Sequence, residues 1–391
     1  MLKVALDIHP ILMLKNKIYK YLASEIFKNF LTILLTFTAI AWTVRAVNFL
    51  DLMIEDGFNA IVYFKYSLLN ISTIVTRFIP LSFLLSMVIC ILKFERQQEL
   101  MILWTAGINK IKVLNIFFLI SVLVTLLGLI LSLIINPFLL HKSRFLLKNT
   151  ELKQVNAVLK SNDFSDAFQG ITFYIDKKNI NNELSNIFIK DVSNSLLISD
   201  TDNASKKNTT ITAKSGYFKN NKLILFDGSI QTLNIKNEIK NFDFKKTELG
   251  VGNFHTRTIT QPKMQETSSY ILMQCLTTKN IDKKIQNCLY SDNKKEVVQT
   301  LSRRIGVPLY VPLIAVIASF LLIYKKEEKF NYLKKYFVFT FAFLILVFSE
   351  ILVKFTGFSL AGAIIYFLAP FVLFVVFYLL LVKNILSERT A

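Results

Sequence analysis

The sequence contains few of the residues that build metal centres and catalytic sites. Its 391 residues include only three cysteines and three histidines, and His9, His141 and His255 are far apart along the chain. Catalytic and structural metal sites need several clustered ligands, and disulfide scaffolds need an even set of thiols. The chain also lacks a G-x-x-x-x-G-K-[ST] loop, an H-E-x-x-H helix and a G-x-S-x-G elbow. We therefore expect no metal, no cofactor, no ATP site and no catalytic residue.

Acidic residues are scarce as well. There are 27 aspartates and glutamates against 46 lysines and arginines, which gives a net charge of +19. At the same time 53% of the residues are apolar, 35 of them are phenylalanines, and the mean hydropathy is +0.46. An ordinary soluble chain has about 45–50% apolar residues. The composition excludes a lone globular enzyme core and indicates a membrane protein. We discount the total charge as a sign of nucleic acid, because a lysine-rich composition can reflect genome base composition.

Six stretches are long and apolar enough to cross a membrane. A helix needs about 20 mostly apolar residues to span about 30 Å of hydrocarbon. The third and sixth stretches are the clearest, because no charged residue occurs in 113–140 or in 355–382. The six predicted spans are residues 30–50, 67–92, 113–137, 305–324, 336–353 and 361–382.

The short loops give the orientation of these spans. If the N-terminus is inside, the inner segments hold 16 lysines and arginines and the outer short loops hold two, Lys65 and Lys354. Positive residues resist translocation, so both termini should be cytoplasmic. A cleavable signal peptide is not expected, because Asp7 interrupts the first apolar run. The predicted domains are 1–137 (an N-terminal amphipathic segment and three spans), 138–304 (an external domain) and 305–391 (three spans and a cytoplasmic C-terminus).

The external segment has the pattern of a β domain. Short alternating or compact apolar runs occupy 171–176, 184–190, 210–213, 216–218 and 222–226. Asn220-Asn221 and Asp227-Gly228 are turn signals between them. Strands at this spacing favour a sandwich, jelly roll or barrel. Residues 142–160 are predicted as a helix or an extended connector, and 261–296 are ambiguous.

Four stretches together resemble one family of membrane proteins. They are the proline-containing piece 80–85 of the second span, the inner loop 93–109 with a glutamate at 99, the β repeat 211–228, and residues 304–308 at the start of the fourth span. In this order, and with three spans on each side of a β insertion, they are similar to the LptF/LptG (YjgP/YjgQ-type) family, permease subunits of the lipopolysaccharide export transporter. Residues 45–57 lean toward the LptF branch.

The resemblance implies a fold, a location and a function. The fold is an α-helical membrane protein with six transmembrane helices (3+3) and an inserted periplasmic all-β jelly-roll domain, in the bacterial inner membrane. The function is to extract lipopolysaccharide from the periplasmic leaflet and to pass it to a periplasmic β-jelly-roll bridge toward the outer membrane. The implied partners are a paralogous LptG-like subunit or a second copy, an LptB-like cytoplasmic ATPase dimer, and an LptC/LptA-like bridge protein. This chain would then be a non-catalytic subunit.

The inner loop is the first candidate site. On a helix, Glu95, Gln98, Glu99 and Ile102 would be neighbours at three- and four-residue spacing. Gly107 would end that helix, as glycine commonly does. The residues alone favour a solvated amphipathic loop. The resemblance implies instead a coupling helix that docks into a groove of the ATPase, with Glu99 at its centre.

Basic residues in the outer half of the membrane are the second candidate site. A charged guanidinium there costs about 2.5–3.5 kcal/mol on insertion scales, so it snorkels, pairs or binds a ligand. By the predicted topology Arg45 and Arg77 lie at this depth. The resemblance implies that Arg45 meets lipopolysaccharide phosphates or sugars. Asn48 stands where some family members carry a second basic residue, and for Arg77 snorkelling and lipid binding remain open.

Other polar pairs have a structural interpretation. Glu350 and Lys354 have the spacing of an ion pair on one helix. Cys275 and Cys288 are both external, so they could form a disulfide in an oxidising periplasm. Pro308, Pro312 and Pro370 can bend their helices or border a cavity.

Two other functions remain open from the sequence. A glycolipid-modifying membrane enzyme would need clustered acids or histidines near the outer interface, and the short outer loops offer only Asp51, Glu55 and Asp56. A membrane-anchored assembly protein that tethers periplasmic partners through the β domain fits the same architecture. Binding and stimulation of an ATPase would separate a transporter from such a tether.

Overall fold

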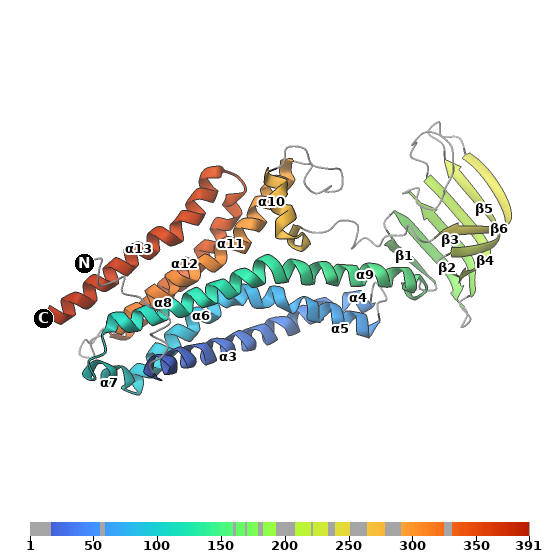
Figure 1. Ribbon diagram of the computed structural model, residues 1–391. Helices are drawn as coiled ribbons and strands as arrows, with labels where there is room; N and C mark the ends of the chain where they lie inside the picture. The colour runs from blue at the N-terminus through green and yellow to red at the C-terminus, as the bar shows by residue number, and fades with distance from the viewer. Residues whose placement is uncertain are drawn as a thin grey trace. The chain divides into compact units, whose positions relative to one another are not determined.

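The computed structural model describes residues 17–54, 59–158, 162–168, 170–178, 183–192, 208–219, 222–233, 239–250, 264–277, 291–323 and 331–390. Within these ranges it contains six helices that are long and apolar enough to cross a membrane, and six strands (Figure 1). The predicted amphipathic segment 1–16 lies outside the described residues, as do His9, His255, Glu55, Asp56 and Cys288.

The six predicted spans are confirmed as helices. The principal helices are α3 (Lys17–Asn48), α6 (Ile71–Arg96), α8 (Lys110–Ile130), α11 (Ser291–Ser319), α12 (Asn331–Thr356) and α13 (Leu360–Thr390). Helices α12 and α13 extend past both ends of their predicted windows, because a helix continues into the polar residues that flank a lipid-spanning core. Helices α3, α8 and α11 begin before their windows but end before the predicted limits, and α6 begins four residues after its predicted start.

Shorter helices connect or continue these spans. The π-helix η1 (Leu131–Ile135) joins α8 to α9 (Asn136–Val158), so the connector that the sequence left open is helical. The remaining short elements are α4 (Asp51–Ile54), α5 (Ala60–Leu69), α7 (Glu99–Thr105), the 3-10 helices η2 (Met264–Glu266) and η4 (Phe320–Ile323), and α10 (Ser269–Thr277).

Helix α11 lies at the centre of the bundle. In its apolar window 72% of the residues are buried, against 11% in α3 and 17% in α13. Because lipid tails are as apolar as leucine, close packing and small residues hold membrane helices together rather than the hydrophobic effect. Gly306 of α11 illustrates this, since it faces the fully buried ring of Tyr366 on α13. The exposed apolar faces of α3 and α13 are those expected of helices that contact lipid.

The inserted domain is one antiparallel sheet whose strands follow chain order. The strands are β1 (Asp163–Phe168), β2 (Ile171–Lys178), β3 (Glu183–Asp191), β4 (Asn208–Lys219), β5 (Lys222–Leu233) and β6 (Ile239–Gly250). The sheet is curved, and β1 and β6 form its two edges (Figure 1). The all-β insertion between the third and fourth spans is thus confirmed.

One face of this sheet carries an apolar core. It is built from alternate residues of β2 to β6, such as Phe173, Ile189, Ile211 and Leu225, each at most 1% exposed. In β3 the alternation shifts by one residue between Leu184 and Ile187, where Asn186 adopts a positive φ of 50°. The strand thereby keeps apolar side chains on the same face on both sides of the irregularity.

One turn prediction is wrong. Asp227 and Gly228 lie inside β5, where Gly228 pairs with Ala213 of β4 and with Phe244 of β6. Asp227 has a positive φ of 47°, so the same residue types that favour turns here produce a local kink in a continuing strand. The turn predicted at 220–221 agrees with the pairing of Lys219 and Lys222 on either side of it.

The chain divides into two compact units. One contains the described residues of Met1–Thr43, Ile71–Leu140 and Lys263–Ala391, and the other those of Val44–Asn70 and His141–Pro262. The outer end of α3 and helix α5 therefore group with the sheet. The predicted boundaries after residues 137 and 304 remain a prediction.

Candidate functional site

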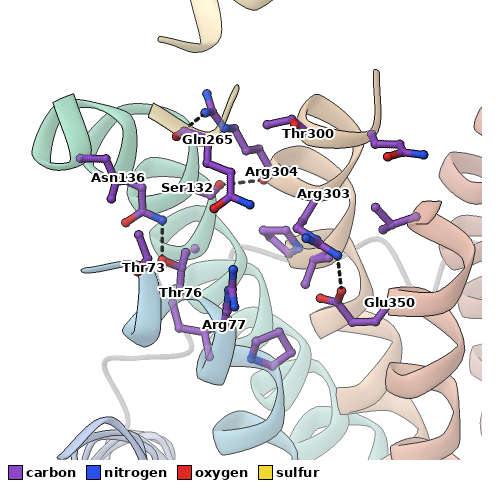
Figure 2. Close-up of a pocket in the computed structure, with 18 of the residues that line it drawn as sticks. Thr73, Thr76, Arg77, Ser132, Asn136, Gln265, Thr300, Arg303, Arg304 and Glu350 are labelled. Carbon is purple, nitrogen blue, oxygen red and sulfur yellow. Dashed lines mark hydrogen bonds and ion pairs between the residues drawn. The ribbon is translucent and has the colours of Figure 1, made fainter. Parts of the chain in front are cut away.

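A cavity of about 220 Å³, lined by both polar and apolar side chains, lies between α6, α8, η1, α9, η2, α11 and α12 (Figure 2). We call it the arginine cavity, because Arg77, Arg303 and Arg304 line it. It lies at the end of the bundle opposite α7, since its lining residues come from the first turns of α6 and the last turns of α12. So many polar side chains in one cavity are unusual between helices that are this apolar.

Irregular helix geometry surrounds this cavity. Pro80 of α6 and Pro308 of α11 both line it, and the π-helix η1 contributes Ser132. π-helical turns are rare and frequently mark functional sites. In membrane proteins such irregular backbone is tolerated where it borders a cavity or packs inside protein. Ser132 fills one such position, because its Oγ donates to the carbonyl oxygen of Arg304 at 2.7 Å.

Arg304 has a structural role, because its side chain holds a neighbouring backbone segment in place. Its side chain is buried and donates to Ser269 and to three backbone carbonyls that precede α10. The contacts are Nη1 to Ser269 Oγ at 2.7 Å, and Nη2 to the carbonyl oxygens of Gln265 at 2.9 Å, Thr267 at 3.0 Å and Met264 at 3.3 Å. A buried charge is tolerated when such acceptors surround it. Arg304 therefore fixes the segment that leads back from the sheet to α11.

Arg303 faces α12 on the other side of the cavity. Its Nη2 donates to Glu350 Oε2 at 3.1 Å. The predicted pair between Glu350 and Lys354 is wrong, because the described residues show the carboxylate paired with Arg303 instead. The backbone oxygen of Lys354 accepts a hydrogen bond from Gln299 at 2.7 Å. The ion pair of Glu350 thus joins α11 and α12, whereas the predicted pair would have lain within α12 alone.

The predicted lipid-binding residues fall in two different units. Arg77 lies on α6 and lines the arginine cavity, close to Thr73 and Thr76 (Figure 2). The side-chain amide of Asn136 donates a hydrogen bond to the hydroxyl of Thr76 at 2.6 Å and accepts one from Ser72, which holds the start of α9 and α6 together. Arg45 and Asn48 belong to the other unit, in the last turn of α3.

The last turn of α3 carries Arg45 and Asn48, and α4 follows it closely in the chain. Arg45 is half-buried and Asn48 is exposed. The backbone oxygen of Ala46, one residue beyond Arg45, accepts a hydrogen bond from the hydroxyl of Tyr63 on α5 at 2.8 Å. Asp51 begins α4 directly after this terminus.

The inner loop is divided into two helices. Helix α6 ends at Arg96 and α7 begins at Glu99, with Gln98 between them at a positive φ of 60°. The expectation that Glu95 shares one helical face with Glu99 is therefore wrong, because the chain turns between them. Glu99 and Ile102 do share α7, and Ile102 is 63% exposed.

Gly107 ends α7 as predicted. It has a φ of 81°, and its N–H donates to the carbonyl of Trp104 while that of Ile108 donates to Leu103, both at 3.1 Å. This pair of hydrogen bonds is the Schellman motif, which favours glycine at the left-handed position. Asn109 then starts α8, since its side chain accepts from the N–H of Ile111.

Polar contacts link several helices at the end of the bundle near α7. Lys335 of α12 donates to both carboxylate oxygens of Glu95 at 3.0 and 2.9 Å, and Lys93 pairs with Glu25 of α3 at 2.7 Å. Tyr21 of α3 donates to Glu99 at 3.1 Å. The start of α7 is thereby linked to α3.

Among the described residues, no group of three or more histidine, cysteine, aspartate or glutamate side chains could hold a metal ion. Cys275 is disulfide-bonded, whereas Cys90 is free and buried. The predicted partner of Cys275, Cys288, lies outside the described residues.

Six apolar helices and a β-sheet inserted after the third are the features of a multi-pass membrane protein with an inserted β domain. Residues 20–384 match the family of the lipopolysaccharide export system permease LptF/LptG. Since this match covers nearly the whole sequence, the chain belongs to the LptF/LptG family, and the resemblance inferred from its motifs is confirmed. The match does not separate the LptF branch from the LptG branch. A comparison with curated proteins gave no match.

Proposed function

We propose that this lipopolysaccharide export permease works as one subunit of an ATP-driven exporter. It extracts the lipid from the periplasmic leaflet of the inner membrane and passes it to a periplasmic bridge toward the outer membrane. The observation that carries the proposal is the family match over residues 20–384, which joins six spans and a β insertion in one chain. The branch remains a prediction, with LptF favoured by residues 45–57.

Helix α7 is the proposed docking element for the ATPase. It is short, it is held at its two ends by the turn at Gln98 and the cap at Gly107, and it presents the exposed apolar side chains of Met101 and Ile102. A short amphipathic helix with apolar anchors suits a groove on a partner protein. Glu99 begins this helix and contacts α3 through Tyr21. A push on α7 would therefore reach the first span directly.

The sheet is the proposed path for the acyl chains. Each CH₂ group left in water costs about 0.8 kcal/mol, so several bare acyl chains would cost tens of kcal/mol. The apolar face formed by residues such as Phe173 and Ile211 can replace that water. Because its edges β1 and β6 are not paired with each other, the sheet can open to admit a chain and pair with a neighbouring sheet.

Arg45 and Asn48 at the end of α3 are proposed as lipid-binding residues of one unit, and Arg77 in the arginine cavity is proposed as a lipid-binding residue of the other. These positions suit phosphates and sugars, because guanidinium groups form charge-assisted hydrogen bonds with phosphate oxygens. The orientation that follows places both termini in the cytoplasm and the sheet in the periplasm. The proposed partners are a paralogous subunit or a second copy, an ATPase dimer and a bridge protein with a similar β fold.

The test is reconstitution with the paralogous subunit and the ATPase in proteoliposomes. Glu99→Lys should reduce ATP-dependent release of lipopolysaccharide and the amount of ATPase that co-purifies. Gln97→Lys is the control, because it introduces a lysine at an exposed position before α7 begins. Normal release by the Glu99→Lys complex would remove the proposed coupling role. A protein that merely tethers partners would show no ATPase stimulation at all.

A further inference from the structure

Only some of the hydrogen-bond donors on the guanidinium of Arg303 have acceptors among the described residues. Its Nη2 donates to Glu350, but its Nε is buried and has no hydrogen-bond partner in the part of the chain that the structure describes. Buried donors in folded proteins nearly always have an acceptor, so an exception needs an explanation. The parallel donors of a guanidinium form a fork that matches two oxygens of a carboxylate or a phosphate. In Arg303, the Nε donor of that fork is buried and unpaired, and the side chain lines the arginine cavity.

The ion pair between Arg303 and Glu350 is weak. It makes one contact of 3.1 Å, and the two side chains are 41% and 49% exposed. A half-exposed ion pair with a single contact contributes little to stability. A phosphate group presents three acceptor oxygens and up to about two negative charges. It can therefore engage both Nε and Nη2, which Glu350 does not do.

The pair also stands where a charged ligand could reach it. Arg303 and Glu350 belong to two membrane-spanning helices, yet both line the arginine cavity and are partly accessible (Figure 2). Charged side chains in such helices usually face the bundle interior or a water-filled cavity. Arg77 lines the same cavity from α6 and adds positive charge.

The size of the cavity limits the ligand. Its volume of about 220 Å³ is roughly seven times the volume of one water molecule, and it is below the range of about 300–1,000 Å³ that holds a drug-sized molecule. One phosphate group and its neighbouring atoms fit, whereas a whole glycolipid head does not.

We propose that the arginine cavity binds one phosphate group of a lipid headgroup on the Nε and Nη2 of Arg303, and that this phosphate displaces Glu350. The identity of the lipid rests on the proposed function, which makes it lipopolysaccharide. Helices α11 and α12 stay joined when the pair opens, because the hydrogen bond from Gln299 to the Lys354 oxygen is separate from it. Binding therefore releases a carboxylate on α12 without separating the two helices.

The test measures binding by the full chain in nanodiscs without ATPase or ATP. The ligands are lipopolysaccharide, phosphatase-treated lipopolysaccharide and phosphatidylglycerol, with inorganic phosphate as a competitor. Arg303→Gln should weaken lipopolysaccharide binding about tenfold, which is the scale of one lost charged hydrogen bond. Arg303→Lys keeps the charge but lacks the fork, so it should also bind less tightly than the wild type. Glu350→Gln should strengthen binding, because it removes the competing carboxylate.

The controls separate this site from folding and from transport. Lys294→Gln removes a positive charge from α11 outside the cavity and should leave binding unchanged. Thermal unfolding of each variant identifies any that fails to fold, and Arg303→Lys then carries the test. Phosphatase-treated lipid should bind wild type and Arg303→Gln equally well.

Three results would overturn the proposal. They are equal lipopolysaccharide binding by wild type and both Arg303 variants, weaker binding by Glu350→Gln, and complete displacement of the lipid by inorganic phosphate. Equal, Arg303-dependent binding of phosphatidylglycerol would overturn the choice of lipopolysaccharide. Because no ATP is present, these results do not depend on whether the exporter model is correct.

Discussion

Replacing Gly306 by alanine tests the close packing of α11 against α13. A Cβ atom at this position would lie 2.1 Å from Cε1 and 2.6 Å from Cζ of Tyr366, whereas ordinary contacts begin at 3.4 Å. The ring has little room to yield, since Tyr366 is fully buried and packs against Tyr310 and Phe367. Overpacking of this kind typically costs about 1–3 kcal/mol. We expect Gly306→Ala to lower the free energy of unfolding by that amount.

The measurement is equilibrium unfolding of the purified chain in mixed detergent micelles, followed by tryptophan fluorescence. The matched background is Tyr366→Ala, which is itself destabilising but removes the atoms that the new methyl group would meet. In that background Gly306→Ala should cost clearly less, with a coupling of about 0.5–3 kcal/mol. An equal cost in both backgrounds would refute the argument from close approach.

Three further predictions concern other parts of the molecule. Glu95→Lys should weaken the contact between α6 and α12 and reduce coupled transport, and the added change Lys335→Glu should restore it in the same assay; no restoration would contradict a direct pair. Gly228→Ala should destabilise the sheet, because its Cβ would lie 2.1 Å from a backbone oxygen, whereas Gly250→Ala meets no atom within 4 Å and should be tolerated; protease resistance of the sheet measures both. Cys275→Ser should lower the free energy of unfolding by about 2–4 kcal/mol, and adding a reductant should destabilise wild type but not the variant; an equal response would contradict a stabilising disulfide.

The membrane-spanning part of the fold could be predicted from the sequence because its signal is local. A long apolar run ended by charges forms a helix in lipid, since every backbone polar group must bond within the segment. The strands of the sheet core could be found in the same way from alternation, as in 184–190 of β3.

The edge strands β1 and β6 were not predicted from the sequence, because few of their side chains are buried. In β6 only Leu249 is buried, so its sequence shows no clear apolar alternation. Strand β1 has six residues and a register irregularity between Ser165 and Phe168. An edge strand is defined by the neighbour it pairs with, which the local sequence does not reveal.

The candidate sites were predictable where one segment determines them. Gly107 ends α7 because glycine suits a left-handed terminus, and the structure agrees. The break at Gln98 had no such signal, because glutamine rarely adopts a positive φ. The partner of Glu350 could not be found, since Arg303 comes from another helix 47 residues away. The arginine cavity likewise depends on seven elements that meet only after folding.

Photo-crosslinking from the apolar face of the sheet tests the central claim most directly. A photoreactive residue at position 211, where Ile211 is fully buried in the apolar core, would report lipid that enters the sheet. In proteoliposomes with the partner subunits, we predict lipopolysaccharide adducts that increase when ATP is added and that disappear with a hydrolysis-deficient ATPase. If an assembly that hydrolyses ATP gave no adduct, or the same amount without ATP, the sheet would not be the path of a driven export, and the account would be wrong.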